Sequence, residues 1–274
     1  MNNHLHVSHI VNLCNIPNIL AKCMRRMGHK VDVLMGNQAD PLNFWEYQRY
    51  TGPLMSVDYI LGAVRDSYIV HVHAWSALIP CLRDYYPDKV LVMHYHGQDV
   101  ESYMRCISED ADLIFCCRDD LNRGGFITVK NPVDLSWWRW SRHSGRRALW
   151  VQSGYKEGET ERMTLAEDLI RNFCRSEGFQ LHVLKRRIDY GPYRRMQWLY
   201  DNHDVYIEFQ DYVNYDRCFT LSMTALEALA CGLKVYYLPE QRWITEFPVD
   251  QDSWVVAEKV LQLYNQALAK RKNG

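Results

Sequence analysis

Residues 218–238 read CFTLSMTALEALACGLKVYYL, and the interpretation of the fold starts from this stretch. Ser222 is a residue type that caps helix N-termini, and the nearly all-apolar run 222–230 predicts a helix that stops at Gly232. The apolar run 234–238 predicts a strand buried behind that helix. A helix followed at once by a buried strand is typical of parallel α/β proteins.

The start of this helix is suited to an anion. Ser222, Met223 and Thr224 are candidate ligands of a diphosphate, because first-turn amides and the helix dipole favour negative charge. Glu227 lies further along in an apolar run, where a carboxylate needs a partner or a ligand. It can accept hydrogen bonds from two vicinal ribose hydroxyls. The alternative is a core helix with one exposed glutamate.

Outward from this stretch, strand-like and helix-like segments alternate. Strands are expected at 4–11, 30–35, 68–73, 89–94, 112–116, 126–129, 148–152, 180–184, 205–209 and 234–238. Helices are expected at 16–27, 57–64, 76–84, 101–108, 161–177, 193–202, 222–230 and 257–268. This order predicts an α/β fold with parallel sheets and helices on both faces.

Two series of strands and helices, joined near 131–147, predict two Rossmann-like lobes, 1–140 and 141–274. The joining stretch WWRWSRHSGRR (137–147) interleaves aromatic rings with cations. We interpret it as a hinge between the lobes with stacked aromatic rings. Contact with an anionic membrane surface or with a nucleic-acid strand is the alternative.

The composition excludes several classes of protein. The chain has 274 residues, of which 47% are hydrophobic and 24% are charged, as is usual for a globular protein. Its formal net charge is −1, which argues against a protein that binds nucleic acid over its whole surface. No apolar run approaches the roughly 18 residues of a spanning helix, and the N-terminus does not have the pattern of a secretory signal. P-loop and GxGxxG patterns are absent, which leaves NTPase and dehydrogenase functions without support.

The cysteines and histidines do not predict a metal site. Nine cysteines without a CxxC pair indicate reduced thiols and a cytoplasmic protein. His71 and His73 alternate along an expected strand, but no carboxylate cluster accompanies them. We therefore predict no bound metal.

The segment ALEALACGLKV (225–235) resembles the signature helix of the group 1 (family 4) nucleotide-sugar glycosyltransferases, which have the GT-B fold. Similar segments follow the family in order: GHKVDVL (28–34), YIVHVHAW (68–75), HYHGQDV (94–100), ADLIFCC (111–117) and NPVDLSWW (131–138). The resemblance implies two Rossmann-like lobes with a cleft between them. It places the acceptor on 1–140 and the nucleotide-sugar donor, a UDP- or GDP-sugar, on 141–274.

The resemblance also implies roles for individual residues. His96 would contact the donor sugar or its phosphate and Asp99 would brace the loop, which makes this pair the expected catalytic residues. Lys156 and Arg187, or Arg186 beside it, are the candidate cations for the diphosphate. The alternatives are an ordinary loop histidine and solvated surface charges.

The sequence departs from the family pattern at one expected acid. Two carboxylates with seven residues between them bracket the loop in the family; the second matches Glu227, but Phe219 stands at the first position. Asp211 and Asp216 are candidate substitutes. The N-terminal loop LCNIPN (13–18) also lacks the family's glycine-rich turn.

The sequence is therefore consistent with three functions. The first is a retaining, metal-independent, hexosyltransferase-like enzyme that needs no cofactor besides its nucleotide-sugar and acts on a hydroxyl of a glycan, lipid or protein. The second is a catalytically degenerate relative or partner subunit that binds a nucleotide or glycan; Phe219 and the N-terminal lobe, shorter than in the family, are the reasons to consider it. The third is a sugar-nucleotide epimerase of the same architecture. Nucleic acid is not expected as a partner, and peripheral membrane contact stays open.

Overall fold

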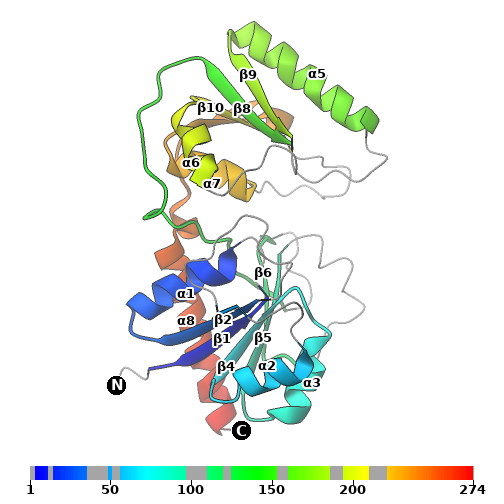
Figure 1. Cartoon of the computed structure of the whole chain (residues 1–274), viewed down its shortest axis with the longest axis vertical. Helices are drawn as coiled ribbons and strands as arrows, with labels where there is room; N and C mark the ends of the chain where they lie inside the picture. The colour runs from blue at the N-terminus through cyan, green and yellow to red at the C-terminus, as the bar shows by residue number, and fades with distance from the viewer. Residues whose placement is uncertain are drawn as a thin grey trace. The chain divides into compact units, whose positions relative to one another are not determined.

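The computed structural model describes residues 4–11, 15–35, 49–50, 56–96, 110–119, 125–152, 160–185, 194–209 and 221–273. The chain divides into two compact units, Met1–Asp134 with Val249–Gly274, and Leu135–Pro248. Each unit contains one β-sheet, as Figure 1 shows. The mixed α/β fold with two parallel sheets that the sequence predicts is confirmed.

The sheet of the first unit is parallel throughout its described strands. Its order is β3-β2-β1-β4-β5-β6-β7. The strands are β1 (His6–Ile10), β2 (Lys30–Met35), β3 (Arg49–Tyr50), β4 (Ile69–His73), β5 (Val90–Tyr95), β6 (Leu113–Cys116) and β7 (Ile127–Thr128). Every residue of β1, β4 and β5 is buried, as expected for strands covered by helices on both faces.

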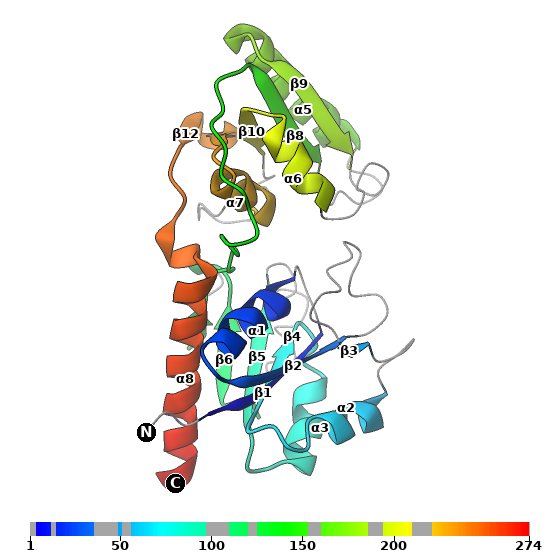
Figure 2. The ribbon, with the colours of Figure 1, turned by 60° about the vertical axis from the view of Figure 1, so that its left-hand side comes forward.

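Among the described residues of the first unit, four α-helices cover the two faces of this sheet (Figures 1 and 2). They are α1 (Ile16–Arg26), α2 (Val57–Ala63), α3 (Leu78–Tyr85) and α8 (Ser253–Asn273). α1 and α8 share one apolar cluster with the sheet, in which Leu20 and Val260 are fully buried. α2 and α3 contribute Ile60 and Leu82 to the cluster on the other face. The helix expected at 101–108 lies outside the described residues.

The placement of α8 differs from the sequence-based division into 1–140 and 141–274. Val249–Gly274, expected in the second lobe, belongs to the first unit. The physical reason is the apolar face of α8, where Val256, Val260 and Tyr264 are buried against α1 and the sheet. Helical periodicity shows that such a face must be buried but not which surface it packs on.

The second unit has a smaller sheet with the order β12-β11-β10-β8-β9. Its strands are β8 (Arg147–Gln152), β9 (Gln180–Lys185), β10 (Val205–Glu208), β11 (Lys234–Tyr237) and β12 (Arg242–Ile244). β12, which the sequence analysis does not predict, pairs antiparallel with β11; the other described pairs are parallel. The helices are α5 (Thr160–Glu177), α6 (Arg194–Asp201) and α7 (Met223–Ala230).

The aromatic and basic stretch 137–147 leads into β8 and belongs to the second unit. Trp138 is buried and meets the Tyr200 ring edge-on, with the ring centroids 5.4 Å apart. The amide of Ser141 donates to the carbonyl of Cys231 at the end of α7. Among the described residues, no helix combines the length and the apolar character that crossing a bilayer requires.

Candidate functional site

The strand orders place a topological switch point in each unit. From β8 the chain moves to β9 on one side and then to β10 on the other; from β1 it moves to β2 and β3, and then to β4 on the opposite side. In open parallel sheets, ligands bind outside the carboxyl ends of the strands at such points. The β8/β10 pair and the β1/β4 pair are therefore the two positions where a ligand is expected.

Next to the β8/β10 switch point, α7 begins as the sequence predicts. The hydroxyl of Ser222 accepts a hydrogen bond from the amide of Ala225 at 3.1 Å, which confirms Ser222 as the N-cap. The carboxylate of Glu208, the last residue of β10, accepts from the Ser222 amide at 3.0 Å and from its hydroxyl at 2.9 Å. Glu208 is 2% exposed. A buried acid therefore holds the junction between strand and helix.

Glu208 affects which of the predicted diphosphate ligands can bind a phosphate. Both donor groups of Ser222 already serve the Glu208 carboxylate, so a phosphate at Ser222 competes with a negative charge. Met223 and Thr224, half-buried in the first turn, are the predicted ligands that lie beyond this contact. Sequence reasoning missed Glu208; its signal is an acidic residue at the carboxyl end of an apolar strand.

Glu227 lies on the buried side of α7 and is 8% exposed, so the alternative of an exposed glutamate is wrong. The hydroxyl of Tyr200 in α6 donates to Glu227 Oε2 at 3.1 Å and lies equally close to the carbonyl of Thr224. Tyr200 is fully buried and was not predicted. A carboxylate offers about four acceptor positions, so this hydroxyl does not exhaust the capacity of Glu227.

The buried carboxylate of Glu227 also affects the pKa of the Cys231 thiol. Burial, and then the charge of the Glu227 carboxylate, raise its pKa. Cys231 therefore stays a neutral thiol at physiological pH, and we do not consider it as a nucleophile.

Several predicted site residues fall on parts of the chain that the structure does not describe. These are Asp99, Lys156, Arg186, Arg187, Asp211, Asp216 and Phe219. Their roles stay predictions.

The switch point of the first unit gathers five histidines, which we call the histidine cluster: His9 of β1, His71 and His73 of β4, His94 of β5, and His96 directly after β5. The parallel register places His9 beside His71 and His73 beside His94. Because side chains two residues apart on a strand share a face, the pairs 71/73 and 94/96 line one side of the sheet. The sequence shows both pairs, but not that their strands are neighbours.

Contacts between imidazole nitrogens link three members of the cluster. His9 Nδ1 lies 3.0 Å from His73 Nε2, and His73 Nδ1 lies 2.8 Å from His96 Nε2. The side chain of Asn131 acts on His96, the predicted catalytic histidine, and favours a higher pKa. His96 therefore ends a chain of imidazoles that starts inside the sheet.

The cluster is neutral at physiological pH. Burial, and then the charge of Arg25, lower the pKa of His9 to about 3. Burial also lowers the pKa of His96, although the side chain of Asn131 acts in the opposite direction. A neutral His96 can exchange hydrogen bonds with a sugar hydroxyl, but it supplies no fixed positive charge to a leaving phosphate. This restricts the role that the sequence suggests for it.

Some nitrogens of the cluster have no hydrogen-bond partner among the described residues. They are Nε2 of His9, Nε2 of His71 and both ring nitrogens of His94, on side chains that are fully buried. A buried polar group left unsatisfied costs about 1–3 kcal/mol. This number of unsatisfied nitrogens in one place calls for a physical explanation.

No protein-family model and no curated protein sequence matches the chain. Among solved structures, the chain is similar to the UDP-GlcNAc 2-epimerase of Methanocaldococcus jannaschii in complex with UDP-GlcNAc and UDP, with a TM-score of 0.56 and 9% identity over 96% of this chain and 100% of that one. It also matches the spinosyn forosaminyltransferase SpnP (TM-score 0.49, 12% identity, 98% of this chain and 93% of that one). A third match is MurG of Acinetobacter baumannii (TM-score 0.43, 13% identity, 94% and 83%).

At this level of identity, the similarity to the epimerase is one of fold. It covers nearly the whole chain, and so includes both parallel sheets. The chain therefore has a GT-B-like fold, the architecture that the resemblance at 225–235 implied.

Proposed function

We propose that this protein is a glycosyltransferase that moves a sugar from a UDP- or GDP-sugar to a hydroxyl acceptor. One observation carries the proposal: the buried carboxylate of Glu227, with the Tyr200 hydroxyl at 3.1 Å, lies one turn into the helix that starts at the β8/β10 switch point. A carboxylate in this position is suited to the two hydroxyls of a nucleotide ribose.

In the proposed reaction, the amides of Met223 and Thr224 hold the diphosphate at the N-terminus of α7. The bond between the sugar C1 and the phosphate oxygen breaks, and the nucleoside diphosphate leaves with the electron pair. Lys156 and Arg187 neutralise this charge as it develops. The acceptor oxygen forms the new bond to C1, and its proton passes to the departing phosphate oxygen.

Two further residues have positioning or binding roles in the proposal. Glu208 does not replace the missing family acid at Phe219; it positions the first turn of α7 through Ser222. His96 hydrogen-bonds the sugar in its neutral form, and Asp99 braces the loop that follows. The proposal includes retention at C1 and independence of metal, both of which rest on the family resemblance.

Binding of donor nucleotides to the purified full-length chain tests the proposal. Isothermal titration and thermal unfolding are measured with UDP, GDP and a panel of their sugars. A bound ligand at 100 times its Kd stabilises the folded state by about 2.7 kcal/mol. We expect Glu227→Gln to weaken binding at least tenfold. Glu246→Gln, the same change at an exposed position of the second unit, serves as the matched control. A chain that binds none of these ligands would contradict the proposal.

An epimerase is the second candidate, because the solved structure with the same fold at a TM-score of 0.56 is a UDP-GlcNAc 2-epimerase. Incubation with the donor alone separates the two activities. An epimerase produces a new nucleotide-sugar without an acceptor, whereas a transferase releases the nucleoside diphosphate only with an acceptor or slowly to water. A chain that binds the nucleotide-sugar but forms neither a new nucleotide-sugar nor a free nucleoside diphosphate would be a catalytically degenerate relative.

A further inference from the structure

The histidine cluster contains a triad that is arranged for a metal ion. His9, His71 and His73 each offer one ring nitrogen, and these three atoms lie within 4.8 Å of one another. All three side chains are 0% exposed and come from the neighbouring strands β1 and β4. Metal ions bind the neutral form of imidazole through a lone pair. Both ring nitrogens of His73 contact other histidines of the cluster, so His73 exchanges one of these contacts for the ion when it binds.

Tyr264 of α8 orients one member of the triad. Its hydroxyl lies 2.6 Å from His71 Nδ1, and with this oxygen as the acceptor, Nε2 of His71 presents its lone pair. Metal-bound histidines almost always donate their second ring nitrogen to an oxygen in this way. Nε2 of His71 is one of the buried nitrogens without a partner among the described residues, as is Nε2 of His9.

Contrary to the expectation from the sequence that no metal is bound, we propose that the first unit binds one divalent transition-metal ion of the class that prefers imidazole, such as Zn²⁺, through His9, His71 and His73. Nitrogen ligands without a carboxylate suit Zn²⁺ and its neighbours better than Mg²⁺ or Ca²⁺. The rings of His71 and His73 stack with centroids 4.2 Å apart, so at least one ring turns about its Cβ–Cγ bond when the ion enters. That torsion is broad and permits the rotation. Water completes the coordination.

The test uses the full-length chain without a histidine tag, treated with a chelator and shown to be folded by circular dichroism. Zn²⁺ binding is measured by calorimetry and by elemental analysis after gel filtration, and Co²⁺ is used for its visible absorption spectrum. We expect one equivalent of metal per chain and the intense spectrum of a tetrahedral Co²⁺ site. No nucleotide-sugar is present, so the result is independent of the proposed transferase activity.

Two variants test the site, one at a ligand atom and one at the hydrogen bond that orients this ligand. Asparagine can place a polar atom near the position of Nδ1 but has none at Nε2, so His71→Asn keeps the contact to Tyr264 and removes the ligand atom. We expect this variant to lose at least 100-fold in affinity. Tyr264→Phe removes only the orienting hydroxyl, and we expect a 10- to 100-fold loss, as is usual for such outer partners.

Two control variants separate the triad from histidines in general. His182→Asn alters a histidine pair in the second unit, where His182 Nδ1 lies 3.0 Å from His203 Nε2. His94→Leu removes a buried histidine outside the triad, which with His73 and His96 forms the alternative group of possible ligands in the cluster. We expect both to retain the metal within about threefold. A folded chain that takes up neither Zn²⁺ nor Co²⁺ overturns the proposal. So does metal binding that His94→Leu abolishes and His71→Asn does not.

Discussion

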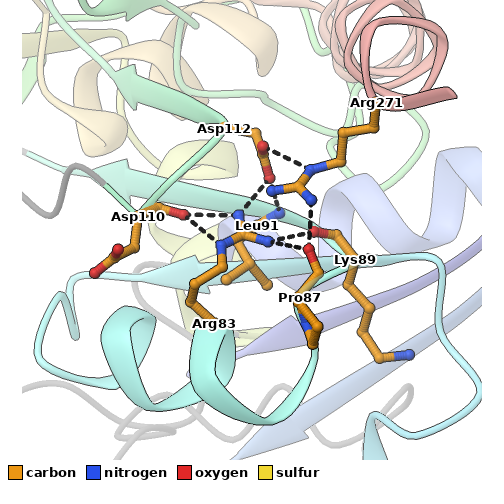
Figure 3. A network of polar contacts seen from close by, with 7 residues as sticks. All are labelled: Arg83, Pro87, Lys89, Leu91, Asp110, Asp112 and Arg271. Atoms are coloured by element: carbon orange, nitrogen blue, oxygen red, sulfur yellow. Dashed lines mark hydrogen bonds and ion pairs between the residues drawn. The ribbon is translucent and has the colours of Figure 1, made fainter. Parts of the chain in front are cut away.

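Arg271 Nε donates to Asp112 Oδ1 across 2.7 Å, although 159 residues separate the two in sequence (Figure 3). The second oxygen of Asp112 accepts from Arg83 in α3 and from the amide of Leu91 in β5, both at 2.8 Å. One carboxylate thus connects the last turn of α8 to a helix and a strand of the first unit. The polar network reinforces the apolar packing that assigns α8 to this unit.

Asp112→Ala is expected to lower the free energy of unfolding of the first unit by about 2–3 kcal/mol, because it leaves the Leu91 amide without its acceptor and removes the carboxylate partner of two guanidinium groups. These two groups keep only backbone carbonyls as acceptors. Urea titration followed by circular dichroism measures the loss. Asp119→Ala is the matched control: its carboxylate pairs with Lys130 but is 65% exposed, so a change within about 0.5 kcal/mol is expected. Equal losses in the two variants would show that the Asp112 network does not stabilise the unit.

Tyr200→Phe is expected to destabilise the second unit by about 1.5–3 kcal/mol, because it removes a buried hydroxyl that hydrogen-bonds the charged Glu227. Unfolding is measured for the two single variants, Tyr200→Phe and Glu227→Gln, and for the double variant. Since the residues are in contact, the double loss should be smaller than the sum by about 1 kcal/mol. Additive losses would mean that the hydroxyl stabilises α7 only through the Thr224 carbonyl.

Gly232→Ala is expected to destabilise the second unit by more than 1–2 kcal/mol. Gly232 has φ of +91°, a left-handed conformation that costs an L-residue about 1–2 kcal/mol, and an added Cβ would lie 2.5 Å from the backbone oxygen of Ser141. Gly62→Ala in α2 is the opposite case. Its Cβ would meet no atom within 4 Å, so a gain of about 0.5–1 kcal/mol is expected from helix propensity. Thermal unfolding of both variants checks the difference in sign.

The first unit is expected to lose stability in mild acid. Burial lowers the pKa of His9 from 6.5 to about 3, so below pH 6.5 the unfolded chain binds a proton that the folded chain does not. The free energy of unfolding therefore decreases as the pH is lowered from 6.5 towards 3. For His9 alone, the slope approaches about 1.4 kcal/mol per pH unit. For His9 alone the loss between pH 6.5 and 5 is about 1.6 kcal/mol, because the unfolded histidine is only half protonated at pH 6.5. The other buried histidines add to the loss, because burial also holds the pKa of His71, His73 and His94 well below 6.5.

Urea unfolding of the chelator-treated protein at several pH values measures this slope. His94→Leu removes one of the protons taken up on unfolding and should make the dependence less steep. A free energy of unfolding that does not change between pH 7 and 5 would show that the cluster is charged or solvated in the folded chain.

The features that the sequence determined by itself are local. The cap at Ser222, the helix stop at Gly232 and the alternation of buried strands with amphipathic helices each depend on neighbouring residues. These features are decided by backbone dihedral preferences and by hydrophobic periodicity over a few turns. For this reason the fold class and most described elements could be predicted without the structure.

Tertiary structure alone decided which of these elements meet. The pairing of β1 with β4 and of β4 with β5 brings the histidines together, the return of α8 adds Tyr264 to them, and β10 brings Glu208 to Ser222. A periodic pattern shows that a face is buried but not which distant segment covers it. Strand order and helix docking arise from packing across the whole chain, and the two candidate sites depend on them.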